Sequence, residues 1–241
     1  MAERLKSISK RISWSSVIKA VVFGVAWWAL PFWLFLLVAL YLSLVPVTGA
    51  RKVLAPFLVL LLLCLATAQG ILAAILFAAI FYFMLLIKDL IIIDRRTAYE
   101  VLILVLSYLV VRELYVTTGG ALGGKALLYS LIAAGAVSVM AAGFIKHFSA
   151  VPDGAAREAH SFRRMLGGLS FILMWQLLIV GLFLPLDFLY QSAVVFLAAA
   201  VLIDVVPQYV FGELSRTKAL ATGTVLFSLL VIVLASAHWT L

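Results

Sequence analysis

Asp204 is the residue whose type and position most strongly suggest chemistry in this chain. It lies in the run AVLIDVVP at residues 200–207, inside an otherwise apolar stretch over 188–210. We expect that stretch to be a membrane-crossing helix, with Asp204 about six residues, or roughly 9 Å, from its inner end. A carboxylate at that depth is unfavourable unless it is protonated, paired or hydrated. Asp204 is therefore a candidate proton- or substrate-responsive site.

Two further polar side chains can complete an intramembrane site around Asp204. Lys19 lies about six residues into the first apolar stretch from the same side, so it has the depth and the sign to pair with Asp204. Gln176 lies in the middle of another apolar stretch and needs a partner on a neighbouring helix. Pro207 follows Asp204 by one turn and weakens the backbone ladder, which opens space for water or a ligand. A structural ion pair between Lys19 and Asp204 is the alternative interpretation.

The segment 146–165 is the second candidate region, and we expect it to be the longest cytoplasmic loop. Its basic surface is formed by Arg157, His160, Arg163 and Arg164. Such a surface can bind lipid phosphate or an acidic partner. Basic residues in cytoplasmic loops also set the orientation of a membrane protein, and that role alone accounts for them.

The run GGALGGKA at residues 119–126 has the G-x-x-x-x-G-K spacing of a phosphate-binding loop. Ala126 stands where the Ser or Thr that holds Mg²⁺ would be, and no β-strand is expected before the run. We interpret it as a flexible glycine loop between two membrane helices. The chain's three histidines have no ligand spacing with its acidic residues, so we predict no metal, cofactor or catalytic residue set.

Composition places these residues in a membrane protein with an all-α fold. Of the 241 residues 66% are hydrophobic and only 12% are charged, whereas soluble domains contain about 45–50% apolar residues. We expect one integral membrane domain over residues 1–241, with a basic interfacial segment at 1–12. The formal net charge of +8 is explained by basic cytoplasmic loops, so no nucleic-acid partner is predicted.

Five apolar segments have the length of about 20 residues that a crossing helix needs, and they lie at 97–115, 125–147, 165–185, 188–210 and 219–240. Residues 14–46 and 53–88 are too long for one crossing and short for two. We divide the first at Leu30 and Pro31 and the second at Gln69 and Gly70, because proline and glycine interrupt helices. A bundle of nine helices results. The alternative is seven, with 14–46 and 53–88 each forming one long kinked helix.

The basic residues indicate the orientation of the bundle. With nine crossings and a cytoplasmic N-terminus, only Arg112 and Lys125 of the 18 basic residues lie outside. This asymmetry is typical of plasma-membrane proteins, and we expect a bacterial plasma membrane. Small residues spaced four apart predict close packing of the helices. One set consists of Ala74 and Ala78, and the other consists of Ala134, Ser138 and Ala142.

Three functional hypotheses remain open from the sequence. The first is a small permease or transporter-like protein with its site at Asp204. The second is a non-catalytic membrane subunit or scaffold of a larger complex, which suits the scarcity of intramembrane polar residues. The third is a membrane-embedded enzyme that modifies lipids. The expected partners are the lipid bilayer and other membrane proteins.

Overall fold

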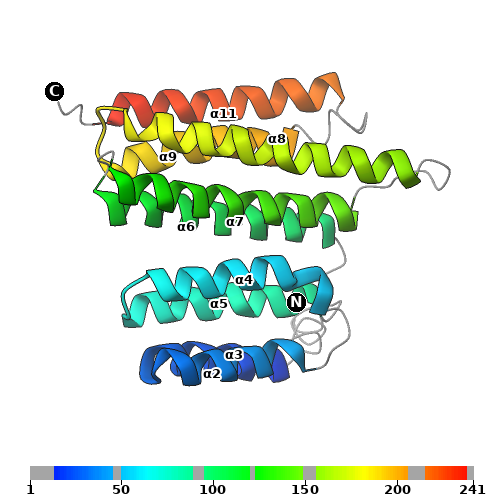
Figure 1. Ribbon diagram of the computed structural model, residues 1–241, viewed down its shortest axis with the longest axis vertical. Helices are drawn as coiled ribbons and strands as arrows, with labels where there is room; N and C mark the ends of the chain where they lie inside the picture. The colour runs from blue at the N-terminus through cyan, green and yellow to red at the C-terminus, as the bar shows by residue number, and fades with distance from the viewer. Residues whose placement is uncertain are drawn as a thin grey trace, which may run out of the picture. The chain divides into compact units, whose positions relative to one another are not determined.

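The computed structural model describes residues 14–45, 50–88, 95–119, 123–148, 156–205 and 215–237, and it is all-α (Figure 1). The chain divides into two compact units, Met1–Leu102 (unit 1) and Ile103–Leu241 (unit 2), and each is described by itself. Whether the chain forms one integral membrane domain stays a prediction. The described residues form nine α-helices and one π-helical turn: α2 (Trp14–Ala29), α3 (Phe32–Leu44), α4 (Ala50–Ala66), α5 (Ile71–Lys88), α6 (Arg95–Thr118), α7 (Gly124–Phe148), α8 (Ala156–Leu182), α9 (Phe188–Ala200), η2 (Val201–Val205) and α11 (Arg216–Ser236).

The division of both long apolar runs is confirmed, and the seven-helix alternative is wrong. Helix α2 ends one residue before Leu30, and Pro31 takes the N-cap position of α3 with φ −56° and ψ 146°. Proline suits that position because the first turn of a helix needs no backbone donor there. The second run breaks between α4 and α5 at residues 67–70, which include Gln69 and Gly70.

Four helices in the described part of the chain are long and apolar enough to cross a membrane. Their spanning stretches are Ile71–Lys88, Arg96–Thr118, Gly124–Phe144 and Ala219–Ser236. The other five apolar stretches are shorter, at 10–17 residues. Length and composition therefore support a multi-pass membrane protein. The cytoplasmic N-terminus and the bacterial plasma membrane stay predictions.

Two predicted boundaries differ from the structure. Residues 146–148 complete α7 and residues 156–165 begin α8, so most of the expected loop at 146–165 is helical. The predicted helix over 188–210 is α-helical only to Ala200 and continues as the π-helical turn η2 to Val205. The basic segment at residues 1–12 lies outside the described residues.

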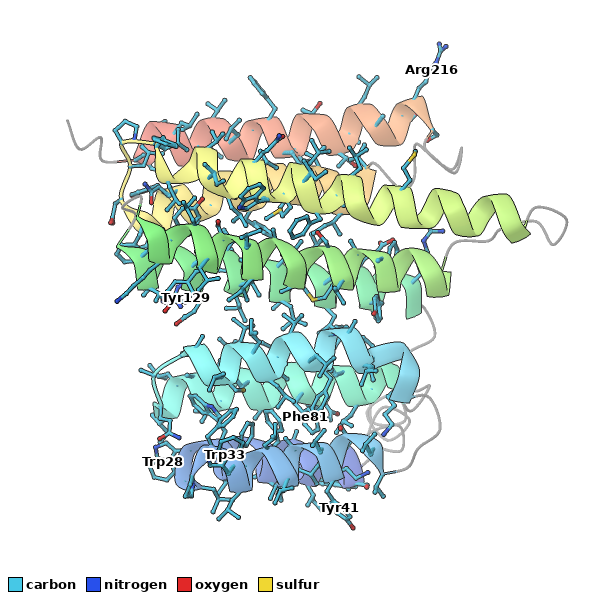
Figure 2. The ribbon with its side chains drawn as sticks, in the orientation of Figure 1. Trp28, Trp33, Tyr41, Phe81, Tyr129 and Arg216 are labelled. Carbon is cyan, nitrogen blue, oxygen red and sulfur yellow. The ribbon has the colours of Figure 1, made fainter. Side chains whose placement is uncertain are left out.

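Unit 1 has an aromatic core between α2, α3 and α5. Phe23 of α2 stacks on Phe81 of α5 with ring centroids 4.2 Å apart, and it meets Phe35 of α3 edge-on at 5.2 Å. Trp27 meets Phe77 in the same way at 5.0 Å. Figure 2 shows Phe81 pointing from α5 toward α2 and α3. All five rings are buried, which makes these contacts the centre of the unit.

The helices α2 and α5 approach closely at Gly24. A Cβ atom at Gly24 would lie 2.9 Å from the Cβ of Ala78 and 3.0 Å from the carbonyl oxygen of Ala74. Ala74 and Ala78 are the small residues that the sequence marks for packing. Their spacing leaves room for the α2 backbone, as the small-residue pattern predicts.

The two hairpin turns of unit 1 are tied together by side-chain hydrogen bonds. The Nε1 of Trp27 donates to the carbonyl oxygen of Cys64 at 2.9 Å, and the Nε2 of Gln69 donates to the carbonyl oxygen of Trp27 at 3.1 Å. The exposed Trp28 and Trp33 lie at the same end (Figure 2). An exposed tryptophan pair beside a turn is typical of the lipid–water interface.

Unit 2 is organised around α8, which packs against α7 and α9, while α11 packs against α9. A Cβ atom at Gly135 of α7 would lie 4.0 Å from the Phe171 ring of α8, and one at Gly167 of α8 would lie 3.9 Å from the Cβ of Ala142. These contacts bring the predicted small-residue face of α7 against α8. The two backbones therefore pack closely, as small residues allow in a membrane.

Helix α6 joins this packing through two tyrosines. The hydroxyl of Tyr115 donates to the carbonyl oxygen of Leu178 in α8 at 2.9 Å. The Tyr108 ring meets the Phe196 ring of α9 edge-on with centroids 5.3 Å apart. Both contacts involve residues of unit 2, so the C-terminal part of α6 is fixed to α8 and α9.

Candidate functional site

A small cavity lies where α7, α8, α9 and η2 meet in unit 2. The volume of this cavity is about 10 Å³, which is close to the smallest volume that holds one water molecule. Its lining is apolar apart from two hydroxyl groups, and the lining residues are Val137, Ser138, Ala141, Ser170, Met174, Ala199 and Ile203. The cavity is therefore about the size of one water molecule, with Ser138 and Ser170 among its lining residues, and it is too small for an organic solute.

The Ser138 hydroxyl is the polar group that sets this cavity apart. Ser138 is 7% exposed, and its Oγ has no hydrogen-bond partner among the described residues. A buried hydroxyl without a partner is unfavourable, and such groups are uncommon in proteins. Ser130, two turns earlier on α7, shows the usual arrangement, because its Oγ donates to the carbonyl oxygen of Leu127 and accepts from Trp175. Ser138 is therefore placed to take a hydrogen bond from a group that enters the cavity.

The chain beside the cavity leaves α-helical geometry. The five residues Val201–Val205 form the π-helical turn η2, and Ile203 of that turn lines the cavity. Pro207 follows in the sequence and has no N–H to bond the carbonyl of Ile203, so one hydrogen bond of a regular helical ladder is missing there. π-Helical turns are rare and occur frequently at functional sites. Asp204 belongs to this turn, while its side chain lies outside the described residues.

The other two members of the predicted intramembrane site lie elsewhere. Lys19 belongs to unit 1, where its Nζ donates to the carbonyl oxygen of Val45 at 2.8 Å. A pair between Lys19 and Asp204 would involve both units and stays a prediction. Gln176 is exposed on α8 and is not among the residues that line the cavity. Of the three predicted residues, the structure places only the turn that carries Asp204 at the cavity.

The predicted basic surface lies on the first turns of α8. Arg157, His160, Arg163 and Arg164 are all within this helix, whereas we expected them in a loop. The spacing of 157, 160 and 164 puts these positions on one face of the helix. Figure 1 shows that this part of α8 extends beyond the end of α7. The side chains of all four residues lie outside the described set, so their role in binding stays a prediction.

Sequence reasoning missed the role of Asp187 and the importance of Ser138. Asp187 is the N-cap of α9, and its carboxylate accepts from the backbone N–H of Phe188 at 2.8 Å. An acidic residue just before an apolar run is a helix-start signal, so this role was readable from the sequence. For Ser138 the sequence indicated only a small packing residue. That its hydroxyl lacks a partner depends on how α7 meets α8.

The run 119–126 was interpreted as a glycine loop, but residues 124–126 already belong to α7 and residues 120–122 lie outside the described residues. Helix α6 precedes this run where a phosphate-binding loop would need a β-strand, and Gly119 has φ 61°, a conformation that favours glycine after a helix. Lys125 is exposed at the start of α7. Among the described residues no group of three or more His, Cys, Asp or Glu side chains could hold a metal ion.

The cavity, the Ser138 hydroxyl and the π-helical turn together define the candidate site. Each comes from a different property of unit 2: the packing of three helices, the burial of a polar group and the change of backbone geometry before Pro207. No family model, no curated protein and no solved structure matches this chain.

Proposed function

We propose that the chain is a small permease-like membrane protein in which Asp204 takes up and releases a proton at the cavity beside η2. The observation that carries this proposal is the unpartnered Ser138 hydroxyl in a cavity of about 10 Å³ next to the turn that bears Asp204. A space of that size admits a water molecule and excludes a sugar, an amino acid or a nucleoside. The proton is therefore the transported or sensed species that suits the site.

The chemistry follows from how hydration changes a carboxyl group inside a membrane. In a dry environment the neutral acid is favoured, because a charge without water or a partner is unfavourable there. A water molecule held by the hydroxyls of Ser138 and Ser170 offers the Asp204 carboxylate a hydrogen-bond donor. Loading and emptying the cavity with water would then switch Asp204 between its neutral and charged forms, with Pro207 leaving the local backbone free to adjust.

The experiment is proton flux into liposomes that contain the purified protein and a trapped pH-sensitive dye, after a pH gradient is imposed. Asp204→Asn keeps the shape of the side chain and removes its ability to ionise, so we expect flux to fall at least tenfold. Asp187→Asn is the matched control, because that carboxylate caps α9 away from the cavity lining. Equal flux in wild type and Asp204→Asn, with both proteins folded, would contradict the proposal.

The scaffold hypothesis predicts a bound membrane partner and no proton flux. None of the apolar stretch Ala219–Ser236 of α11 is buried within the chain, which suits contact with lipid or with another membrane protein. A stoichiometric membrane partner that co-purifies from native membranes, combined with no proton flux, would favour the scaffold. Flux from the isolated protein would favour the permease.

A further inference from the structure

Two charged residues of opposite sign are neighbours near the C-terminal end of α6. Arg112 and Glu113 belong to the apolar stretch Arg96–Thr118, which is long enough to cross a membrane. Arg112 lies six residues before Thr118, or roughly 9 Å from that end along the helix axis. Both side chains are half-buried. A charge at this depth is unfavourable unless another group pairs with it or hydrates it.

Neither residue has a partner among the described residues. No hydrogen bond or ion pair joins Arg112 or Glu113 to another described side chain or backbone group. They cannot pair with each other, because consecutive residues of a helix point about 100° apart. At the start of the same helix, by contrast, Arg96 and Glu100 form an ion pair at 3.4 Å, since a spacing of four places them on one face.

The other charged residues at this end of unit 2 leave both charges unpaired. Helices α6, α8 and α11 end here, and α7 and α9 begin here (Figure 1). Lys125 is exposed at the start of α7, and Asp187 caps α9. The undescribed residues that follow α6 and α11 are 120–122 and 238–241, and His238 is the one ionisable side chain among them. Unit 2 therefore has no further carboxylate side chain at this end for Arg112.

Arg112 lies on the outward face of α6 among valines. Val105 and Val116 are seven residues before it and four after it, so the three positions share one face of the helix. Both valines are exposed, at 39% and 42%, whereas Val110 and Leu114 on the opposite side are buried. A single copy of the chain would present this cation to lipid. The face is therefore suited to a partner that brings a carboxylate to the same depth.

A second copy of the chain has such a carboxylate, because Glu113 is the neighbour of Arg112. If a two-fold axis along the membrane normal relates two copies, their α6 helices are parallel and equivalent residues lie at equal depth. Arg112 of one copy then differs in depth from Glu113 of the other by about 1.5 Å, and the pairing occurs twice. An anionic phospholipid would pair with Arg112 but repel Glu113. Charge complementarity therefore favours the second copy.

We propose that two copies of this chain associate in the membrane through the outward face of α6, with Arg112 of each copy paired to Glu113 of the other. The guanidinium and carboxylate groups can form two parallel hydrogen bonds in each pair. Val105 and Val116 pack across the contact. The cavity of unit 2 is lined by residues of α7, α8, α9 and η2, so this contact does not depend on the permease proposal.

The test measures Förster energy transfer between full-length proteins, fused to donor and acceptor fluorescent domains, in vesicles of pure phosphatidylcholine. Dilution of the protein with lipid gives the dissociation constant of the dimer. We expect Arg112→Glu and Glu113→Arg each to weaken self-association about tenfold, because each replaces two attractive pairs by two repulsive ones. Lys125→Gln, which removes an exposed charge at the start of α7, is the matched control and should leave the constant unchanged.

A mixture of the two reversed variants separates pairing between copies from pairing within one copy. Donor-labelled Arg112→Glu and acceptor-labelled Glu113→Arg carry complementary charges at both contacts, so we expect mixed dimers with roughly the wild-type constant. If a reversed variant does not fold, Arg112→Gln and Glu113→Gln replace it, and each should weaken self-association about threefold.

Three results would overturn the proposal. Wild-type constants in both reversed variants, or in both neutral ones, would show that this face of α6 is not the contact. Weakening in the single variants without recovery in the mixture would place the pairs within one chain. A wild type that is monomeric in phosphatidylcholine and associates only after phosphatidylglycerol is added would make Arg112 a lipid site. None of these measurements records proton flux, so failure here is distinct from failure of the permease proposal.

Discussion

The polar groups of unit 1 contrast with one hydroxyl of unit 2, although other polar side chains of unit 2, such as Tyr115 and Ser130, are hydrogen-bonded as well. In unit 1 the polar side chains join helix ends: Trp27 and Gln69 tie the two turns, and Lys19 and Lys88 meet the carbonyls that end α3. In unit 2 the Ser138 hydroxyl is buried in a cavity without a partner, beside a turn that departs from α-helical geometry. Polar groups that close a structure stabilise it, whereas an unsatisfied one is retained at a cost. The candidate site therefore lies in unit 2.

Gly181→Ala tests the tight packing of unit 2 and has the largest expected effect. A Cβ atom there would lie 2.0 Å from the Tyr115 hydroxyl oxygen and 2.5 Å from the Cγ2 of Val195. Relief of this clash displaces Tyr115 and breaks its bond to Leu178, so we expect a loss of about 2–4 kcal/mol in the free energy of unfolding. Gly168→Ala, with nothing within 4 Å, is the control. Equal melting temperatures of the two variants in detergent would show that α6 and α8 are not packed as described.

Trp27→Phe tests the ties of unit 1. The substitution keeps an aromatic ring against Phe77 but removes the N–H that bonds the Cys64 carbonyl. A buried carbonyl then loses its side-chain partner, and we expect a loss of about 1–3 kcal/mol, measured by circular dichroism during thermal unfolding. Trp28→Phe is the control because Trp28 is exposed. If Trp28→Phe were the more damaging change, the assignment of Trp27 as the tie between turns would be wrong.

Ser138→Ala has the smallest expected effect on stability and sharpens the contrast with Ser130. Removal of a hydroxyl that has no protein partner should change the free energy of unfolding by less than about 0.5 kcal/mol, or raise it. Ser130→Ala should cost about 1 kcal/mol, since Ser130 makes two hydrogen bonds, one of them to Trp175 on α8. A larger loss in Ser138→Ala than in Ser130→Ala would mean that the Ser138 hydroxyl is already used for stability.

Local signals in the sequence were sufficient to predict the two breaks in the apolar runs of unit 1. Pro31 cannot donate a backbone hydrogen bond, and Gly70 follows the polar Gln69, so these residues mark the positions of both hairpin turns. The helical start of α8 was missed because charged residues in a membrane protein suggest a loop, although helices extend beyond the bilayer when their backbone bonds are satisfied internally. The position of a basic segment therefore does not show where a membrane helix begins or ends.

The candidate site was only partly predictable. Asp204 and the disturbed backbone before Pro207 follow from residue types alone, and the π-helical turn agrees with the predicted disturbance. Gln176 was chosen because it is polar in an apolar run, but which face of α8 it occupies depends on packing, and it is exposed. Lys19 was chosen by depth and sign, while its observed bond to Val45 depends on the fold of unit 1. The sequence alone could not predict which distant segments contact one another.

Proton flux through the Ser138→Ala variant tests the central claim most directly, because the Ser138 hydroxyl has no hydrogen-bond partner among the described residues and yet lines the cavity. Liposomes containing wild type, Ser138→Ala and Ser130→Ala are compared under the same pH gradient, after the fold of each is checked by circular dichroism. We predict that Ser138→Ala lowers the flux at least fivefold with no loss of stability, while Ser130→Ala lowers stability and retains its flux per folded protein. Wild-type flux in Ser138→Ala would contradict the assignment of the cavity as the functional site.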